Sequence, residues 1–186
     1  MKSTCLLPLL ALLGACSGPR PEAGGGPVID ANTITFNNFE AGGGWSNDPG
    51  RNDPNLIAKG QAHSGQYALV INHDHEYSLA FDMPLGRISS RKFKVIHLEA
   101  WAYLPSEHGA ANINLQILQP DGNGQVTAGN LELGSAVKTY HEWVKVEKDF
   151  PMPDNITAVQ RLHVFVWRAG ATDEVLLDDV LLSIKE

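Results

Sequence analysis

Cysteine is nearly absent from this chain of 186 residues, since only Cys5 and Cys16 occur. Both lie close to the N-terminus, so the rest of the sequence offers no thiol for a disulfide or a cysteine-ligated metal. A domain that follows Cys16 must therefore be held together by its core alone. The length that remains suits one domain with a substantial core.

An excess of basic residues is also lacking. The chain carries 14 Lys and Arg against 21 Asp and Glu, which gives a formal net charge of −7. Nucleic-acid binding usually requires a basic patch, so this composition argues against a nucleic-acid partner. Long apolar runs are missing as well, because none reaches the ~20 residues that a membrane-spanning helix needs.

The N-terminus has the pattern of an export signal. Met1 and Lys2 supply positive charge, and residues 5–15 form an almost purely apolar run that ends in small residues. The Leu13–Cys16 segment (LGAC) resembles the lipobox of bacterial lipoproteins, which implies cleavage before the cysteine and lipidation of its thiol. We therefore expect residues 1–15 to be a lipoprotein signal peptide. An ordinary signal peptide with a chance cysteine is the alternative.

Residues 16–29 are expected to comprise the lipidated Cys16 and a flexible linker. The stretch after the cysteine is rich in Gly and Pro and too poor in apolar residues to pack. In lipoproteins of two-membrane bacteria, a serine such as Ser17 after the cysteine usually favours the outer membrane. We expect an exported protein, lipid-anchored to the bacterial outer membrane and facing either the periplasm or the outside.

Residues 30–186 show short alternating segments separated by Gly, Pro, Asn and Asp. Residues 94–104 alternate throughout, and residues 113–117 repeat the pattern before Asp121–Gly124, a turn signal that predicts a hairpin. No window shows a convincing helical period. These features predict one all-β domain, a two-sheet antiparallel β-sandwich of the jelly-roll type.

Alternation also sorts the side chains of each predicted strand by face, because neighbours point to opposite sides of a sheet. Three segments keep an apolar face for the core and carry aromatic, amide and acidic side chains on the other. A groove lined by Trp101, Tyr103 and Trp167 would support a ligand. The candidate ligand-binding residues are Glu99, Trp101, Tyr103, Asn112, Asn114, Gln116 and Trp167.

This combination of side chains suits a sugar. A pyranose ring has an apolar C–H face that lies on an aromatic ring, and its hydroxyls need planar, bidentate partners such as Asn, Gln and Glu. Two other interpretations remain open. Aromatic residues are common on exposed strand faces or under loops, where they form a minor core, and amides on a strand face are often only solvated.

Several segments, taken in order, resemble family 4/9/22-type carbohydrate-binding modules, which are galactose-binding-like β-sandwich jelly rolls. They are Phe39-Glu40 before a Gly-rich stretch ending in Trp45, then residues 62–69, 98–103 and 143–146, and the closing Leu176–Val180. The likeness covers the chain from about residue 36 to the end. It implies a non-catalytic glycan-binding domain.

The resemblance also implies a structural calcium ion. In such modules an acid after the first strand and an acid on the last strand commonly hold the ion, together with backbone carbonyls. These positions match Glu40 and Asp178, with Asp179 as the other candidate. Calcium takes six to eight oxygen ligands, and a buried carboxylate is costly without a partner. Solvated acids that hold no ion are the alternative.

Evidence for an enzyme is weak. No G-x-S-x-G, H-E-x-x-H or phosphate-loop motif occurs. His73 and His75 would share one strand face and could share a metal, although their polar surroundings favour a hairpin tip. The sequence thus predicts a membrane-anchored, non-catalytic binding domain for polysaccharide or glycan. The alternative is a cell-surface protein–protein interaction or assembly module that uses the same aromatic face without sugar.

Overall fold

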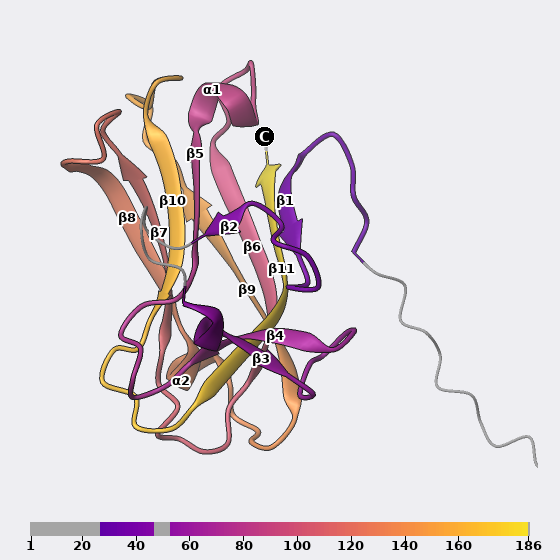
Figure 1. Ribbon diagram of the computed structural model, residues 1–186. Coiled ribbons are helices and arrows are strands. Elements are labelled where there is room, and N and C mark those ends of the chain that lie inside the picture. The colour runs from indigo at the N-terminus through magenta and orange to yellow at the C-terminus, as the bar shows by residue number, and fades with distance from the viewer. Residues whose placement is uncertain (1–26, 47–52, 186) are drawn as a thin grey trace, which may run out of the picture.

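The computed structural model describes residues 27–46 and 53–185 (Figure 1). The predicted signal peptide, Cys16 and most of the predicted linker lie outside the described residues. Within them, no helix combines the length and the apolar character that crossing a membrane requires. The described helices are single turns, namely η1 (Pro54–Leu56), α1 (Leu85–Ile88) and α2 (Leu133–Ala136).

The strands form two antiparallel sheets. Sheet A has the order β3 (Ile57–Lys59), β4 (Tyr67–Ile71), β11 (Val175–Lys185), β6 (Val95–Tyr103) and β9 (Trp143–Pro151), and β1 (Thr33–Asn37) also pairs with β11. Sheet B has the order β2 (Trp45–Ser46), β5 (Ala80–Pro84), β10 (Arg161–Trp167), β7 (Asn112–Leu118) and β8 (Gln125–Glu132). Figure 1 shows them as two layers, which confirms the predicted sandwich.

One continuous apolar core lies between the sheets. On β6, Ile96 and Leu98 are fully buried, and on β7, Ile113, Leu115 and Ile117 are at most 1% exposed. The inward faces predicted from alternation are therefore confirmed in both sheets. Because the two inner faces share this core, the two outer faces point in opposite directions.

Connections between strands decide which outer face each residue joins. The chain leaves sheet A after β6 and enters sheet B at β7, so these consecutive strands belong to different layers. The predicted hairpin after β7 is confirmed, with the amide of Gln119 donating to the carbonyl of Gly124 at 2.9 Å. β5 begins at Ala80, and Tyr77, which precedes it, forms an isolated bridge with Trp167.

Candidate functional site

The predicted ligand-binding residues do not lie on one surface. Glu99, Trp101 and Tyr103 stand on β6 of sheet A, whereas Trp167 stands on β10 of sheet B. The three amides, Asn112, Asn114 and Gln116, belong to β7 of sheet B. A single groove lined by Trp101, Tyr103 and Trp167 is therefore wrong, because the sandwich core separates the first two rings from the third. Two separate outer faces must be considered.

On the outer face of sheet A, the ring of Trp101 is covered by a loop. The 60–66 loop between β3 and β4 places His63 flat on the indole, with ring centroids 3.8 Å apart and an interplanar angle of 11°. Trp143 on β9 contacts His63 edge-on at 5.9 Å and Tyr103 at 5.7 Å. Tyr103 and Trp143 also pack on a small apolar cluster that includes Val70. Trp101 thus packs beneath the loop, and Tyr103 packs beside it against Trp143.

The remaining candidate on β6, Glu99, is engaged in ion pairs. Its carboxylate contacts Nζ of Lys145 at 2.5 Å and Nε2 of His97 at 3.0 Å. The hydrogen bond from Lys145 is the main reason that the pKa of Glu99 lies below its usual range. This acid therefore stays ionised and paired within sheet A.

Three acids hold the 60–66 loop in place, and they are the three predicted metal ligands. Asp178 Oδ2 accepts hydrogen bonds from the amides of His63 and Ser64, each at 2.9 Å. Asp179 accepts from the ring of His63 at 2.6 Å and from the hydroxyl of Ser64 at 2.7 Å. Glu40 Oε1 accepts from the amides of Gln66 and Tyr67, at 2.6 and 2.8 Å. The acids thus gather around one loop, as the resemblance implies.

The backbone of β11 makes this arrangement possible. The pairing of β11 with β6 shifts register between Asp178 and Leu181, and Asp179 has a positive φ of 48°. Such a bulge inserts an extra residue and re-aims its neighbours, and aspartate tolerates this conformation better than most residues. Gly65 is equally constrained, because a Cβ there would lie 2.4 Å from Oε1 of Glu40. The loop and the bulge therefore fit each other closely.

Asp178 is the most unusual acid of the described chain, since it is fully buried. Burial raises its pKa to about 6, although hydrogen bonds from the amides of Ser64, Asp179 and His63 act in the opposite direction. The nearby charge of Asp179 raises it further. A buried carboxylate with this environment is stabilised by any cation that can approach it.

A calcium ion fits part of this donor set. The carboxylates of Glu40 and Asp178 are oxygen donors of the kind that calcium prefers. Both carboxylate oxygens of Asp178 and of Asp179 already accept hydrogen bonds, so an ion would have to share oxygens that hold the loop. Among the described residues, these three acids do not form a group of side chains close enough to share an ion by themselves. Main-chain oxygens would have to complete the site.

His73 and His75, the other metal candidates, do not come together either. His73 contacts its neighbour Asp74 at 3.0 Å, whereas His75 Nε2 contacts Asp53 at 2.7 Å. Asn72 Oδ1 also contacts Nδ1 of His75 at 3.0 Å. His73 thus pairs with its chain neighbour, whereas His75 joins its own turn to the segment at Asp53.

The outer face of sheet B carries the other candidates in an ordered grid. Three outward residues of β10 are aromatic (His163, Phe165 and Trp167), and three outward residues of β7 are amides (Asn112, Asn114 and Gln116), so an aromatic row runs beside an amide row. β8 adds further polar positions on the far side of β7. The cross-strand pairs are His163 with Gln116, Phe165 with Asn114, Trp167 with Asn112, Asn114 with Asn130, and Asn112 with Glu132.

The aromatic row on β10 is partly exposed and continuous. The rings of His163 and Phe165 lie 5.1 Å apart, and Tyr77 meets Phe165 edge-on at 5.9 Å. Tyr77 is 57% exposed and Trp167 is 39% exposed. In contrast to Trp101, these rings offer surface to solvent.

Two acids fix the ends of this row. Glu76 accepts from the indole Nε1 of Trp167 at 2.7 Å and forms an ion pair with Arg168 at 2.8 Å. The hydrogen bond from Arg168, followed by that from Trp167, holds the pKa of Glu76 below its usual range. At the other end, Asp82 contacts His163 and forms an ion pair with Arg161. The face is therefore ordered by ionic contacts before any ligand arrives.

Sequence reasoning missed several residues of this face. His163 and Phe165 alternate with core residues in the same way as Trp167, so the same signal could have selected them. Tyr77, Asp82 and Asn130 reach the face only through strand pairing between distant segments. No local pattern marks them.

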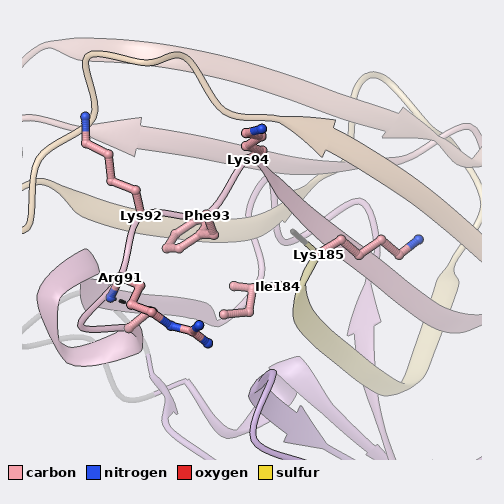
Figure 2. Close-up of a pocket in the computed structure, with 7 residues that line it drawn as sticks. Arg91, Lys92, Phe93, Lys94, Ile184 and Lys185 are labelled. Atoms are coloured by element: carbon pink, nitrogen blue, oxygen red, sulfur yellow. Dashed lines mark hydrogen bonds between the residues drawn. The ribbon is translucent and has the colours of Figure 1, made fainter.

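A surface pocket lies elsewhere, between the segment before β6 and the end of β11 (Figure 2). Phe93 and Ile184 contribute apolar surface, and Arg91, Lys92, Lys94 and Lys185 surround them. In Figure 2 the ammonium groups of Lys92 and Lys185 point away from the phenyl ring. Lys92 donates to the carbonyl of Asp154, and Lys185 contacts Asp149. The cations therefore do not converge on one ligand.

Several solved structures that are similar to this chain are carbohydrate-binding modules. The CBM22-1 xylan-binding domain from Paenibacillus barcinonensis Xyn10C is 20% identical with a TM-score of 0.50, over 84% of this chain and 97% of that chain. The C-terminal family 22 module of Clostridium thermocellum Xyn10B is 12% identical with a TM-score of 0.53, over 85% and 97% of the two chains.

The tandem CBM22-1–CBM22-2 structure from the Paenibacillus protein is 16% identical with a TM-score of 0.55, over 83% of this chain. The match spans only 50% of that two-module chain. No protein family and no curated protein matches the sequence. At these identities the likeness shows the fold: the chain has the jelly-roll architecture of carbohydrate-binding modules.

Proposed function

We propose that this chain is a non-catalytic binding domain that takes a polysaccharide on the outer face of sheet B. The observation that carries the proposal is the aromatic row on β10 beside the amide row on β7. Trp167 and Tyr77 offer exposed rings for the C–H faces of sugar units. Asn112, Asn114 and Gln116 offer donors and acceptors for hydroxyl groups.

Preorganisation supports the same face. Binding costs less when the side chains are already held in place. Glu76 holds the indole of Trp167, and Asp82 holds His163. Asn114 Nδ2 donates to the carbonyl of Asn112 at 3.1 Å, which leaves its second amide hydrogen for a ligand. The similar CBM22-1 domain of the Paenibacillus protein is a xylan-binding domain, so we propose a β-linked plant polysaccharide of this kind as ligand.

Affinity electrophoresis tests this proposal. The protein is run through gels that contain xylan or other plant and algal polysaccharides, and we expect retardation by xylan. Trp167→Ala should abolish retardation and leave the melting temperature nearly unchanged, because its ring is partly exposed. Asn114→Ala should weaken binding. An unretarded protein across the whole panel would instead favour the assembly-module alternative.

We propose, separately, that a calcium ion stabilises the 60–66 loop through Glu40, Asp178 and main-chain carbonyls. The close approach of both acids to this loop supports the proposal, as does the burial of Asp178. Chelation should lower the melting temperature of the protein, and Glu40→Ala should remove that response. A chelator that leaves the melting temperature unchanged would contradict the proposal.

We further propose that Cys16 is lipidated and attaches the exported domain to the outer membrane. The support is the sequence of residues 1–17 alone, with its apolar run and its LGAC segment. Cells that express the chain with Cys16→Ser should release it into the soluble fraction, whereas the unchanged chain should fractionate with the outer membrane. Mass spectrometry of the purified N-terminal peptide should find the acyl chains.

A further inference from the structure

A cluster of ionisable side chains on the outer face of sheet A takes no part in the functions proposed above. Within the described residues, His97, Glu99 and Glu147 form the one group of three side chains close enough to share a metal ion, with ligand atoms within 4.8 Å of one another. Two neighbouring strands, β6 and β9, supply them. They lie on rigid, paired backbone, which is what a precise metal site requires.

The imidazole of His97 is oriented for coordination. It is 9% exposed, and its Nδ1 contacts Asp149 Oδ1 at 2.5 Å. A metal-bound histidine usually donates its other ring N–H to a carboxylate. Lys185 Nζ also lies 2.9 Å from Nδ1 of His97 and donates to the same oxygen of Asp149 at 2.7 Å, so the imidazole and the ammonium share this carboxylate. Here the other nitrogen, Nε2, faces Glu99 Oε1 at 3.0 Å. That contact is favourable only when a proton or a metal cation lies between the two atoms.

The strand register supplies an independent reason to expect a cation. Glu99 stands directly opposite Glu147 in the antiparallel pairing of β6 with β9. Like charges at directly opposed positions destabilise a sheet unless a positive charge joins them. Lys145 partly fills this role through its contact with Glu99 Oε2 at 2.5 Å. Its side chain is 47% exposed, so the ammonium can swing into solvent when another cation arrives.

We propose that His97, Glu99 and Glu147 bind a zinc ion on the outer face of sheet A, with Asp149 as the positioning residue behind His97. An imidazole nitrogen with two carboxylate oxygens is a ligand set that zinc accepts, and water completes the tetrahedral coordination. An imidazole ligand disfavours calcium and magnesium, which prefer oxygen alone. This site is therefore distinct in place and in metal from the calcium site proposed at Glu40 and Asp178.

Titration calorimetry with zinc chloride tests the proposal. We use the full chain without an affinity tag and with Cys5→Ser and Cys16→Ser, so that no thiol can bind the metal. We expect one zinc per chain, unaffected by excess calcium. Cobalt(II) should bind at the same site and show the absorption bands of a tetrahedral complex with nitrogen and oxygen ligands.

Variants separate coordination from simple surface charge. Glu147→Gln removes one of the three proposed ligands. It should weaken zinc binding at least as much as the loss of Asp149, the carboxylate that orients His97. Asp149→Asn, which removes that carboxylate, should weaken it by about 10- to 100-fold. Lys145→Gln should tighten zinc binding, because it removes the competing ammonium. His73→Gln is the matched control on an exposed histidine outside the cluster and should change nothing.

The proposal is overturned if the protein binds no zinc, or if Glu147→Gln and His73→Gln have equal effects. Weaker binding by Lys145→Gln would also overturn it, since a structural role of the lysine would then dominate. Melting temperatures without metal confirm that each variant is folded. None of these outcomes depends on polysaccharide binding.

Discussion

Trp101 and Trp167 show how much the surroundings of one side chain matter. Each tryptophan lies on the outward side of a strand whose alternate residues point into the core. His63 covers the ring of Trp101 at 3.8 Å, whereas the ring of Trp167 is 39% exposed and is held only at its indole nitrogen by Glu76. The first ring therefore contributes to stability, and the second is available for binding.

We predict that Trp101→Ala lowers the free energy of unfolding by about 2 kcal/mol, somewhat less than the loss for a fully buried tryptophan. His63→Ala should lower it by a smaller amount, because it uncovers the same indole. Urea denaturation measures both changes. Polysaccharide affinity should survive in each variant. A Trp101→Ala protein of unchanged stability that no longer binds glycan would contradict this assignment.

The ion pair at Glu76 leads to a prediction about pH. Its pKa is held below the ordinary 4.5, chiefly by Arg168 and then by Trp167. For an acid of lowered pKa, the favourable interaction is present above the ordinary value and is lost as pH falls through the lower, folded-state value. The indole N–H resonance of Trp167, assigned with Trp167→Phe, should therefore hold its position down to pH 4.5 and move only below it. A midpoint above 4.5 would show that Glu76 does not hold the ring.

At the scale of strands, alternation predicts which side chains enter the core but not which sheet a strand joins. β6 and β7 follow each other in the chain and alternate in the same way, yet they lie in opposite layers. Both layers share one core, so the pattern of β6 alone fits either layer. For this reason the sequence pattern allowed Trp101 and Trp167 to be placed on the same outer face. The covering of Trp101 by His63 depends on long-range packing, which has no local signature.

The bulge in β11 is a second feature that periodicity does not reveal. Two adjacent acids lie within the apolar strand β11, and the resemblance to known modules implied that Asp178, with Asp179 as the other candidate, holds a metal. In the structure, Asp178 is buried beneath the loop on the outer face of sheet A, while Asp179 adopts a φ of 48° and binds His63 and Ser64. The sequence thus indicated that these acids needed partners, whereas their division of roles depends on the local backbone.

This division predicts different responses at Asp179. A valine there must adopt a left-handed conformation, which costs about 1–2 kcal/mol, and it also loses both hydrogen bonds to the loop. We expect Asp179→Val to lower the free energy of unfolding by roughly 2–4 kcal/mol in urea. Asp179→Asn tolerates the same backbone and keeps one acceptor, so its loss should be about 1 kcal/mol. Equal losses would show that backbone strain is unimportant at the bulge.

At the scale of the whole molecule, the sandwich has two outer faces with different characters. The outer face of sheet A carries the acids, the covering loop and the proposed metal sites. The outer face of sheet B carries the ordered aromatic and amide rows. β1 and β11 pair with each other, so the described chain begins and ends in sheet A. A domain attached through its N-terminus would thus be joined to its anchor through the sheet that does not carry the proposed glycan face.

A double-mutant cycle tests this separation directly. If Trp101 and Trp167 lay in one groove, removing either ring would change what the other contributes to binding. Because the core separates their faces by about 10 Å, the usual spacing of packed sheets, we predict independence. Trp167→Ala should reduce xylan affinity by the same factor in the wild-type and Trp101→Ala backgrounds, within about 0.5 kcal/mol.

Titration calorimetry with a soluble xylan oligosaccharide supplies the four affinities. A second cycle, with Asn114→Ala in place of Trp101→Ala, is the matched positive control. That pair lies on one face, next to Phe165, so its effects should not add. Coupling between the two tryptophans as large as in the control would mean that a ligand reaches both sheets.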